Sequence, residues 1–452
     1  MGVGGIGVSA LAEMARHAGA EVSGCDKSCN ECTRRLTQKG IRIEAGHDPK
    51  HVESVDLLVY SSAVPESHPE RLAAGNRQEK RGEFLARFMN ASDSVGVSGT
   101  HGKTTTSWLL SHVLIAAGMD PCVFVGGLVA ELPEGNYRIG SGPFVAELDE
   151  SDASFLYPRL KIAVVTNVES DHLSHYQTKS ALFDAFRRFA AGVRESGVLV
   201  AGTDDPGAAK LFDEHVGKKI SFGISGETDL RARVIAGASG ATRFEAEYKN
   251  AALGEFVLPL PGLHNVKNAL AALAVALELG VDADTARRAL ANVCGVGRRM
   301  ERLGTVGRAV VYSDYAHHPT EVAAAIAGVR QAHSGKVLVV FQPHLYTRTR
   351  DYALEFGKAL AAADAALVAD IYPAREEPIP GVTSQLVVDA GRELNPAVAG
   401  PYPLEQIEDE TERMAGDFEA VVMMGAGSID DVARRFVRER TSGAIPSGEQ
   451  NA

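Results

Sequence analysis

Short apolar runs alternate with longer amphipathic stretches along most of the chain. The runs at 94–98, 144–147, 162–167 and 197–201 are rich in small and β-branched apolar residues and are too short for stable helices, so we expect buried strands there. The stretches between them repeat apolar residues at helical spacing. Strands that alternate with helices in this way predict parallel sheets and an α/β fold.

The alternating pattern divides into three domains and a tail. We expect a Rossmann-like N-terminal domain at residues 1–89, a central P-loop ATPase-like domain with a parallel sheet at 90–300, and a Rossmann-like C-terminal domain at 301–440. Within the central domain, residues 217–260 change to short alternating segments, which predict a small antiparallel patch. Residues 441–452 are polar and are expected to form a flexible tail.

Composition restricts the kind of partner. The chain has 452 residues, of which 45% are hydrophobic and 23% charged, and its formal net charge at pH 7 is −12. An acidic protein is a poor match for nucleic acid or anionic membranes, so small-molecule substrates are favoured. No apolar run approaches the roughly 20 residues of a spanning helix and no signal peptide begins the chain, which predicts a cytoplasmic protein. The sequence leaves open whether it is a monomer or a homodimer.

The most informative feature is a glycine-rich segment between the apolar run 94–98 and a predicted helix. It consists of Gly99, Thr100, His101, Gly102, Lys103, Thr104 and Thr105. In such a loop, backbone N–H groups surround phosphate oxygens, the lysine reaches the outer phosphates and the next hydroxyl binds Mg²⁺. Val97 stands where the full Walker pattern has its first glycine, so the loop is a variant. An ordinary glycine-rich turn is the alternative, but Gly-Lys-Thr at a helix start favours an ATP site.

Candidate metal ligands follow the next two strands, at the same edge of the sheet. Four carboxylates end the strand 144–147, with Glu147 nearest to it, and oxygen ligands suit Mg²⁺ beside nucleotide phosphates. The alternative is an acidic helix N-terminus. His172 follows the strand 162–167 and is a candidate for a second Mg²⁺ ligand or a phosphate contact.

Further polar residues follow predicted strands or begin predicted helices. Asn265 and Asn268 are three apart on one helix face and could bind an adenine edge, although Asn265 could also simply cap the helix. Three segments of the C-terminal part bring charge or a titratable ring to a strand end, namely residues 297–301, 314–319 and 341–350. Solvated charged loops are the alternative there.

The chain opens with a glycine loop typical of dinucleotide-binding folds. Gly4, Gly5 and Gly7 precede a helix-like stretch, and Asp26 ends an apolar run about 20 residues later. That fingerprint needs a strand before its first glycine, and only Met1 is available here. We therefore expect that an extension of about ten residues upstream would stabilise the chain.

A second apolar run in the N-terminal domain, 55–64, contains Ser61 and Ser62 in a polar turn. Turns of this kind at the carboxyl ends of parallel strands are common ligand sites.

The cysteines of this domain cluster in the sequence. Cys25, Cys29 and Cys32 include a pair with zinc-like spacing, but a second matching pair is missing, so we expect loop residues after a strand rather than a metal site.

Together these motifs resemble the Mur ligase family, the ATP-dependent amide-forming enzymes of peptidoglycan precursor synthesis. The matching segments, in order, are 99–105, Glu147 with 149–152, Thr166-Asn167 with Asp171-His172, His264-Asn265 with Asn268, Arg298-Arg299, 314–319 and 425–427. The likeness spans nearly the whole chain. The opening glycine loop, His101 and the segments 150–152 and 341–344 are similar to those of members that join L-alanine to UDP-N-acetylmuramate.

The resemblance implies a role for each candidate residue. It implies that the N-terminal domain binds UDP-N-acetylmuramate through Gly4, Gly5, Gly7, Asp26, Ser61 and Ser62. It implies that residues 99–105 bind ATP, that Thr104, Glu147 and His172 hold Mg²⁺, and that Lys103, His172 and Arg299 are catalytic. It also implies that adenine contacts Asn265 and Asn268, that the ribose contacts Asp314, that phosphates contact Arg299 and His317, and that the alanine faces Tyr315, His344 and Arg348.

The resemblance also implies a two-step reaction in which ATP phosphorylates a carboxylate and an amine then attacks the acyl phosphate. Three rival functions remain at the level of sequence. The chain could be a recycling ligase that attaches a whole tripeptide to the same sugar nucleotide, a nucleotide-gated regulatory protein without turnover, or an NAD-dependent oxidoreductase based on the first glycine loop.

Overall fold

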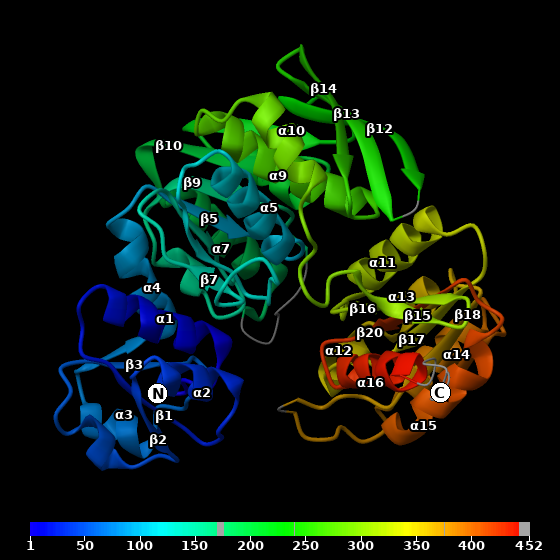
Figure 1. Ribbon diagram of the computed structural model, residues 1–452, viewed down its shortest axis with the longest axis horizontal. Coiled ribbons are helices and arrows are strands. Elements are labelled where there is room, and N and C mark those ends of the chain that lie inside the picture. Colours follow the sequence, from blue (N-terminus) through cyan, green and yellow to red (C-terminus); the bar gives the residue numbers. More distant parts are fainter. Residues whose placement is uncertain (170–175, 239, 375, 443–452) are drawn as a thin grey trace, which may run out of the picture. The chain divides into compact units, whose positions relative to one another are not determined.

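A computed structural model describes residues 1–169, 176–238, 240–374 and 376–442 of the chain (Figure 1). The candidate His172 lies outside the described residues, as does most of the expected tail. The described chain packs into two compact units. The first contains residues 1–233, 246–254 and 267–290, and the second contains 234–245, 255–266 and the residues from 291 onward. The expected domain boundaries at 89/90 and 300/301 stay predictions.

The N-terminal part of the first unit contains two small parallel sheets with helices around them. Its strands are β1 (Ser23–Asp26), β2 (Arg42–Ala45), β3 (Leu58–Tyr60) and β4 (Gln78–Lys80), and β1 pairs with β2 while β3 pairs with β4. Its helices are α1 (Ile6–His17), α2 (Glu31–Gln38), the short η1 (Pro49–Val52), α3 (Pro69–Ala74) and α4 (Arg81–Asn90). The first residues of the chain contact both sheets, since the Met1 amine donates to the Val59 carbonyl and Gly2 N–H donates to the Cys25 carbonyl.

The expectation that all three clustered cysteines are loop residues is wrong for two of them. Cys25 is buried within β1, and Cys32 lies in the first turn of α2. Cys29 is the one that lies in the connecting loop, where its side chain is exposed. Zinc-like spacing along the sequence therefore does not bring these three thiols together.

A ten-stranded sheet runs through the central part of the chain, in the order β14-β13-β12-β11-β10-β9-β5-β8-β6-β7. Its strands are β5 (Ser94–Ser98), β6 (Cys122–Phe124), β7 (Tyr137–Arg138), β8 (Phe144–Glu147), β9 (Leu160–Val165), β10 (Val193–Gly202), β11 (Lys218–Gly223), β12 (Leu230–Ala238), β13 (Ala241–Tyr248) and β14 (Ala251–Leu258). From β11 to β6 the neighbours are parallel, and β5 is buried along its whole length. Burial on both faces explains why β5 contains only small residues and valines.

The expected antiparallel patch at 217–260 is smaller than the sequence pattern suggested. β11 pairs parallel with β10, and β12 begins by pairing parallel with β11, so the parallel sheet continues past residue 217. β13 and β14 form a hairpin joined by Lys249 and Asn250, whose positive φ angles of 49° and 67° suit a two-residue primed turn. Alternating polarity shows that one face of a strand is exposed to solvent. It does not show whether the strand pairs parallel or antiparallel with its neighbour.

Helices cover this sheet and form the core of the first unit. They are α5 (Lys103–Ala116), the short η2 (Ser154–Leu156), α7 (Lys179–Ala191), α8 (Pro206–Glu214), α9 (Leu263–Glu278) and α10 (Ala283–Ala291). Phe155 of η2 is fully buried, and its ring lies 5.2 Å from that of Phe186 and 5.1 Å from that of Phe189, both on α7. Aromatic contacts of this kind fix η2, and with it the acidic segment before η2, against the sheet.

The second unit holds a six-stranded sheet in the order β15-β16-β20-β17-β18-β19 (Figure 1). The strands are β15 (Glu301–Val306), β16 (Ala309–Asp314), β17 (Val337–Phe341), β18 (Ala365–Ala369), β19 (Val398–Tyr402) and β20 (Ala420–Met424), and all neighbours are parallel except β15 and β16. The helices are α11 (Pro319–Ala332), α12 (Tyr346–Asp351), α13 (Ala353–Leu360), α14 (Gln385–Arg392), α15 (Leu404–Ala415) and α16 (Ile429–Ser442).

Alternate strand residues of this sheet pack into two cores on opposite faces. One core joins the sheet to α11, α13 and α14, and the other joins it to α15 and α16. The three adjacent strands β16, β20 and β17 are parallel, so their carboxyl ends at Asp314, Met424 and Phe341 meet at one edge. The loops that leave this edge carry the candidate residues of the C-terminal domain. Throughout the described parts of the chain, helices fall short of the length and apolarity that a bilayer span requires.

Candidate functional site

The predicted glycine loop lies between β5 and α5, as the sequence indicated. The structure explains why Gly99 and Gly102 of this loop must be glycine. Gly99 has φ +136°, and a Cβ there would lie 2.1 Å from Thr166 Oγ1. Gly102 has φ +83°, and a Cβ there would lie 2.3 Å from Asn268 Oδ1. Both the backbone conformation and the lack of space therefore require glycine at these two positions.

The end of β9 holds this loop in place. Thr166 Oγ1 donates to the His101 carbonyl at 2.6 Å, and Asn167 Nδ2 donates to the same carbonyl at 3.1 Å. The amide oxygen of Asn167 accepts the His101 N–H at 2.8 Å, while its carbonyl accepts the Thr100 N–H. In the sequence, Thr166 and Asn167 stood out only as residues that match the family, and the structure shows that they position the loop.

Lys103 begins α5 and points back into its own loop. Its Nζ donates to the Gly99 carbonyl at 2.7 Å and lies 3.0 Å and 2.9 Å from the two carboxylate oxygens of Glu150. Burial lowers the pKa of Lys103, but Glu150 and the neighbouring carboxylates outweigh that effect and raise it. Burial raises the pKa of Glu150 to about 7, and Lys103 opposes the rise. The result is a fixed ammonium group at the loop, with Glu150 as a partner that the sequence did not single out.

Oxygen donors suitable for a magnesium ion lie next to the loop. Glu147 ends β8 and is the register partner of Val97 on β5, two residues before the loop begins. One of its oxygens accepts the Gly126 N–H at 2.7 Å, and Thr104 is buried in the first turn of α5. A carboxylate and a hydroxyl are hard donors, so the residues at this edge fit Mg²⁺.

The two asparagines of α9 occupy different surroundings. Asn268 lies against the glycine loop, since its Oδ1 accepts from Thr106 Oγ1 at 3.3 Å and limits the space at Gly102. Asn265 is the third residue of α9 and donates through Nδ2 to the Pro261 carbonyl at 2.8 Å. The helix begins at Leu263, so capping does not explain Asn265, and adenine binding by the two asparagines stays a prediction.

In the second unit, Asp314 fixes the turn that carries Arg299. Its two carboxylate oxygens accept the N–H groups of Met300 and Ala316, each at 2.7 Å, and burial raises its pKa to about 6. Arg298 and Met300 flank Arg299 and have left-handed φ angles of 58° and 49°. Such conformations are uncommon outside glycine and are typical of functional loops.

The predicted alanine-facing residues meet in the same unit. The ring of His317 lies 5.2 Å from that of Tyr315 and 5.8 Å from that of His344, and Arg348 Nη1 lies 3.3 Å from His344 Nδ1. Burial lowers the pKa of His317 to about 4, so its imidazole is neutral at pH 7. The structure therefore gathers Tyr315, His317, His344 and Arg348 into one polar group.

Two further residues belong to this C-terminal group, and the sequence did not indicate either. Glu321 lies 3.7 Å from Arg299 and 3.2 Å from His317 Nδ1, and it accepts the His317 N–H. The ring of Tyr372 stacks on His344 with centroids 5.9 Å apart. Glu321 lies in the first turn of α11, where acidic residues are common because they are stabilised by the helix dipole. The sequence therefore did not indicate that Glu321 also contacts Arg299 and His317.

The opening glycine loop is held by Asp26 at the end of β1. Gly4 N–H donates to Asp26 Oδ2 at 2.7 Å, and a Cβ at Gly4 would lie 2.8 Å from that oxygen. Gly5 and Gly7 lie at the start of α1, and a Cβ at Gly7 would lie 3.0 Å from the Arg81 guanidinium.

The two candidate serines follow β3. Ser61 is partly buried and accepts the Ala63 N–H, and Ser62 is exposed.

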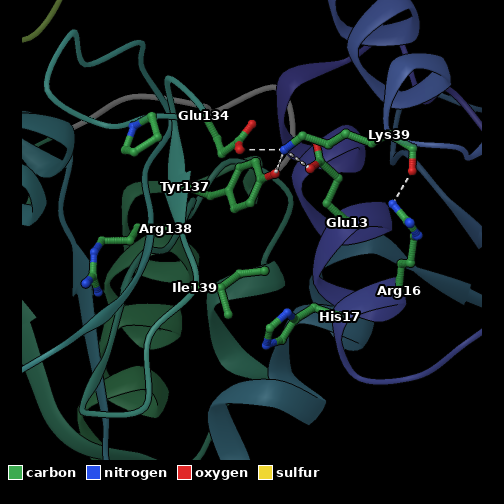
Figure 2. A pocket seen from close by; sticks show the side chains of 9 residues that line it. Glu13, Arg16, His17, Lys39, Glu134, Tyr137, Arg138 and Ile139 are labelled. Carbon is green, nitrogen blue, oxygen red and sulfur yellow. Dashed lines mark hydrogen bonds and ion pairs between the residues drawn. The ribbon is translucent and has the colours of Figure 1, made fainter.

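A separate pocket of about 600 Å³ lies between α1 and the segment 133–139 (Figure 2). Figure 2 shows Lys39 between Glu13 and Glu134, and its Nζ lies 2.5 Å from a Glu134 oxygen and 3.3 Å from the Tyr137 hydroxyl. Glu13 is buried and also pairs with Arg35 at 3.2 Å. The described residues that line this pocket include none of the predicted site residues. Ion pairs beside it connect Glu13 of α1 to Arg35 of α2, and Lys39 to Glu13 and Glu134.

Family models match three consecutive parts of the chain. The model described as Mur ligase family, catalytic domain matches residues 1–93, the Mur ligase middle domain matches residues 97–276, and the Mur ligase glutamate ligase domain matches residues 298–427. The three matches together include every candidate residue named above.

Curated relatives and solved structures agree with these matches. The chain is 42% identical over 447 residues to the UDP-N-acetylmuramate–L-alanine ligase of Sorangium cellulosum, and the aligned region covers 96% of this chain and 94% of the relative. It is 46% identical over 400 residues to the enzyme of the same name from Kineococcus radiotolerans, with coverage of 86% and 84%. The crystal structure of UDP-N-acetylmuramate-alanine ligase from Thermotoga maritima superimposes with a TM-score of 0.81 at 28% identity, covering 98% of each chain.

Proposed function

Because this chain belongs to the Mur ligase family of ATP-dependent amide-forming ligases, we propose that it joins L-alanine to the carboxylate of UDP-N-acetylmuramate. The observation that carries the proposal is the Lys103 ammonium, which donates at 2.7 Å to the Gly99 carbonyl of a glycine loop between a strand and a helix, an arrangement typical of phosphate sites. The near full-length likeness to relatives named for this reaction supports the choice of substrates.

The proposed chemistry asks the protein mainly to position charge. The muramate carboxylate attacks the terminal phosphorus of ATP, the bond to the bridging oxygen breaks, and ADP leaves. The amine of alanine then attacks the resulting acyl phosphate, phosphate leaves, and the amine loses a proton as the amide forms. Negative charge grows on phosphate oxygens in both steps, and Lys103 with the loop N–H groups would stabilise it.

Magnesium would add to this stabilisation. Thr104 and Glu147 supply the oxygen donors that would hold the ion, and His172 is proposed to serve a second one. A bound Mg²⁺ neutralises phosphate charge and orients the transferred group.

The remaining candidates are proposed as binding residues. In the nucleotide site, Asn265 and Asn268 would contact adenine, Asp314 the ribose, and Arg299 and His317 phosphates. In the substrate sites, Gly4, Gly5, Gly7, Asp26, Ser61 and Ser62 would bind the UDP-sugar, and Tyr315, His344 and Arg348 the alanine. Asp314 already accepts two backbone N–H groups, so a ribose hydroxyl would use its remaining lone pairs.

A reaction that consumes ATP and a UDP-linked sugar is expected in the cytoplasm, and its product would supply cell-wall growth and division. The test is phosphate release from ATP by the purified chain with Mg²⁺ and UDP-N-acetylmuramate, with and without L-alanine. We expect sustained release only when both acceptors are present, with formation of one amide per phosphate. Release that responds to a tripeptide and not to free alanine would assign the recycling reaction instead. No turnover with either would refute the proposal.

A further inference from the structure

A cluster of metal-binding side chains surrounds Glu70 in the N-terminal part of the first unit. Glu70 lies in the first turn of α3 and is fully buried. Cys25 Sγ lies 3.2 Å and 3.3 Å from its two oxygens, His47 Nδ1 lies 3.0 Å from Oε2, and His51 Nδ1 lies 2.7 Å from Oε1. Cys25 Sγ and His47 Nδ1 are 3.6 Å apart. None of these four residues belongs to the proposed ATP or substrate sites.

The distances from the Cys25 sulfur are those expected around a shared central cation. In tetrahedral zinc sites the Zn–S bond is about 2.3 Å and Zn–N or Zn–O bonds are about 2.0–2.1 Å, so neighbouring ligand atoms lie about 3.3–3.6 Å apart. The sulfur-to-nitrogen distance of 3.6 Å agrees with that geometry, and the sulfur-to-oxygen distances of 3.2 Å and 3.3 Å are close to it. The nitrogen-to-oxygen distances of 3.0 Å and 2.7 Å are hydrogen-bond lengths, and both would lengthen when an ion enters between these groups. Cys25, His51 and Glu70 offer ligand atoms that all lie within 4.8 Å of one another, as do His47, His68 and Glu70.

We propose that Cys25, His47, His51 and Glu70 bind one Zn²⁺ ion. A thiolate with two imidazoles favours zinc over magnesium, which prefers oxygen ligands only. On binding, the Cys25 thiol releases its proton to solvent, the histidines bind as neutral imidazoles through Nδ1, and Glu70 binds as a carboxylate. The charges of one thiolate and one carboxylate balance the cation, so the occupied site is neutral, which is what a buried position requires.

His68 supports this arrangement from the side. Its ring meets the ring of His47 edge-on with centroids 4.7 Å apart, and its Nδ1 accepts the Glu70 N–H at 3.3 Å. It therefore positions both His47 and Glu70, as hydrogen-bonded neighbours of metal ligands commonly do.

The ion would connect three stretches that are far apart in the sequence, namely the one with Cys25, the one with His47 and His51, and the one with Glu70. Cys25 comes from β1, His47 from the turn after β2, His51 from η1 and Glu70 from α3. The strands here form two separate pairs, β1-β2 and β3-β4, rather than one broad sheet. A cation that joins β1 to α3 would stabilise this part of the chain, because metal binding to the folded state alone adds to its stability.

Cobalt binding to the untagged full-length chain tests the proposal. After removal of bound metal with a chelator, Co²⁺ is added as a probe and Zn²⁺ as a competitor. We expect one Co²⁺ per chain with a tetrahedral spectrum and a thiolate-to-metal charge-transfer band that Zn²⁺ abolishes. Cobalt at the oxygen ligands proposed for Mg²⁺ would give no such band, so failure of the ATP site and failure of this site are distinguishable.

Three variants make the test specific. Cys25→Ser should abolish the charge-transfer band, and His51→Ala should weaken Co²⁺ binding by at least about tenfold, since losing a ligand costs more than losing its hydrogen-bonded neighbour. Cys29→Ser is the matched control, because Cys29 is exposed and lies in the loop that follows the strand of Cys25, and this variant should bind Co²⁺ like the unaltered chain. Zn²⁺ should raise the melting temperature of the unaltered chain and of Cys29→Ser, but not of Cys25→Ser. Absence of the band in the unaltered chain, or its persistence in Cys25→Ser, would overturn the proposal.

Discussion

Two groups in the second unit, the buried Asp314 and the partly buried His317, should make its stability depend on pH in opposite directions. Burial lowers the pKa of His317 from 6.5 to about 4, although Glu321 opposes the shift. Burial raises the pKa of Asp314 from 3.8 to about 6, although Arg299 opposes that shift. Both groups therefore bind protons differently in the folded and unfolded chain across nearly the same pH range.

The sign of each contribution follows from which state binds the proton. The unfolded chain protonates His317 below pH 6.5, whereas the folded chain protonates it only near pH 4. The contribution of His317 to the free energy of unfolding is therefore complete above pH 6.5 and is lost as the pH falls through 4. The folded chain protonates Asp314 near pH 6, whereas the unfolded chain protonates it only near pH 3.8. The contribution of Asp314 to the free energy of unfolding is therefore complete below pH 3.8 and is lost as the pH rises through 6. At about 1.4 kcal/mol per unit of pKa, each amounts to about 3 kcal/mol, and they nearly cancel.

Single substitutions should reveal the hidden dependence. Between pH 6.5 and 4, the free energy of unfolding of His317→Gln should rise by about 3 kcal/mol relative to the unaltered chain, and that of Asp314→Asn should fall by a similar amount. Because a chain with two units need not unfold in one step, the measurement is urea-dependent hydrogen exchange read on peptides from β16 and β17. His17→Gln, an exposed substitution in the other unit, is the control. Parallel pH curves for His317→Gln and the unaltered chain would refute the reasoning.

Three further outcomes test the proposed phosphate site. Lys103→Ala should reduce turnover by at least about a hundredfold in the phosphate-release assay, in line with the loss of a preorganised charge contact, and near-normal turnover would contradict its role. Gly102→Ala should weaken ATP binding by roughly tenfold or more in calorimetry, because a left-handed conformation alone costs a side chain about 1–2 kcal/mol and the added methyl would lie 2.3 Å from Asn268 Oδ1; unchanged affinity would show that the loop can rearrange. Glu147→Gln should raise the Mg²⁺ concentration needed for half-maximal rate at saturating ATP, and an unchanged Mg²⁺ dependence would remove Glu147 from the metal site.

The sequence predicted the position of the glycine loop between β5 and α5 because its signals are local. A buried strand, two glycines, a lysine and a helix start follow one another within a dozen residues, and each constrains the backbone directly. The parallel order of the surrounding strands followed from their alternation with helices. The positions of Thr166 and Asn167 at the loop came from strand pairing between β5 and β9, and only the resemblance had marked them.

The sequence could not predict contacts that depend on tertiary packing. Glu70 and His51 lie 45 and 26 positions after Cys25, and no local pattern joins them, whereas the nearby Cys29 and Cys32 share a suggestive spacing but no common site. Similarly, Glu150 was one of four carboxylates in a short run, and the fold selects it as the partner of Lys103. Residue type marks which chemistry is available, but the fold decides which groups meet.

The pairing of Lys103 with Glu150 has a consequence for how an anion enters the loop. A phosphate that approaches the ammonium competes with a carboxylate that is 1% exposed and would be left without its counter-charge. Since the pKa of Glu150 is already about 7, the least costly response is for that carboxyl group to become protonated as the nucleotide arrives. Nucleotide binding at neutral pH would then take up a proton from the buffer, so calorimetric enthalpies should vary with the ionisation enthalpy of the buffer, and in Glu150→Gln that variation should disappear.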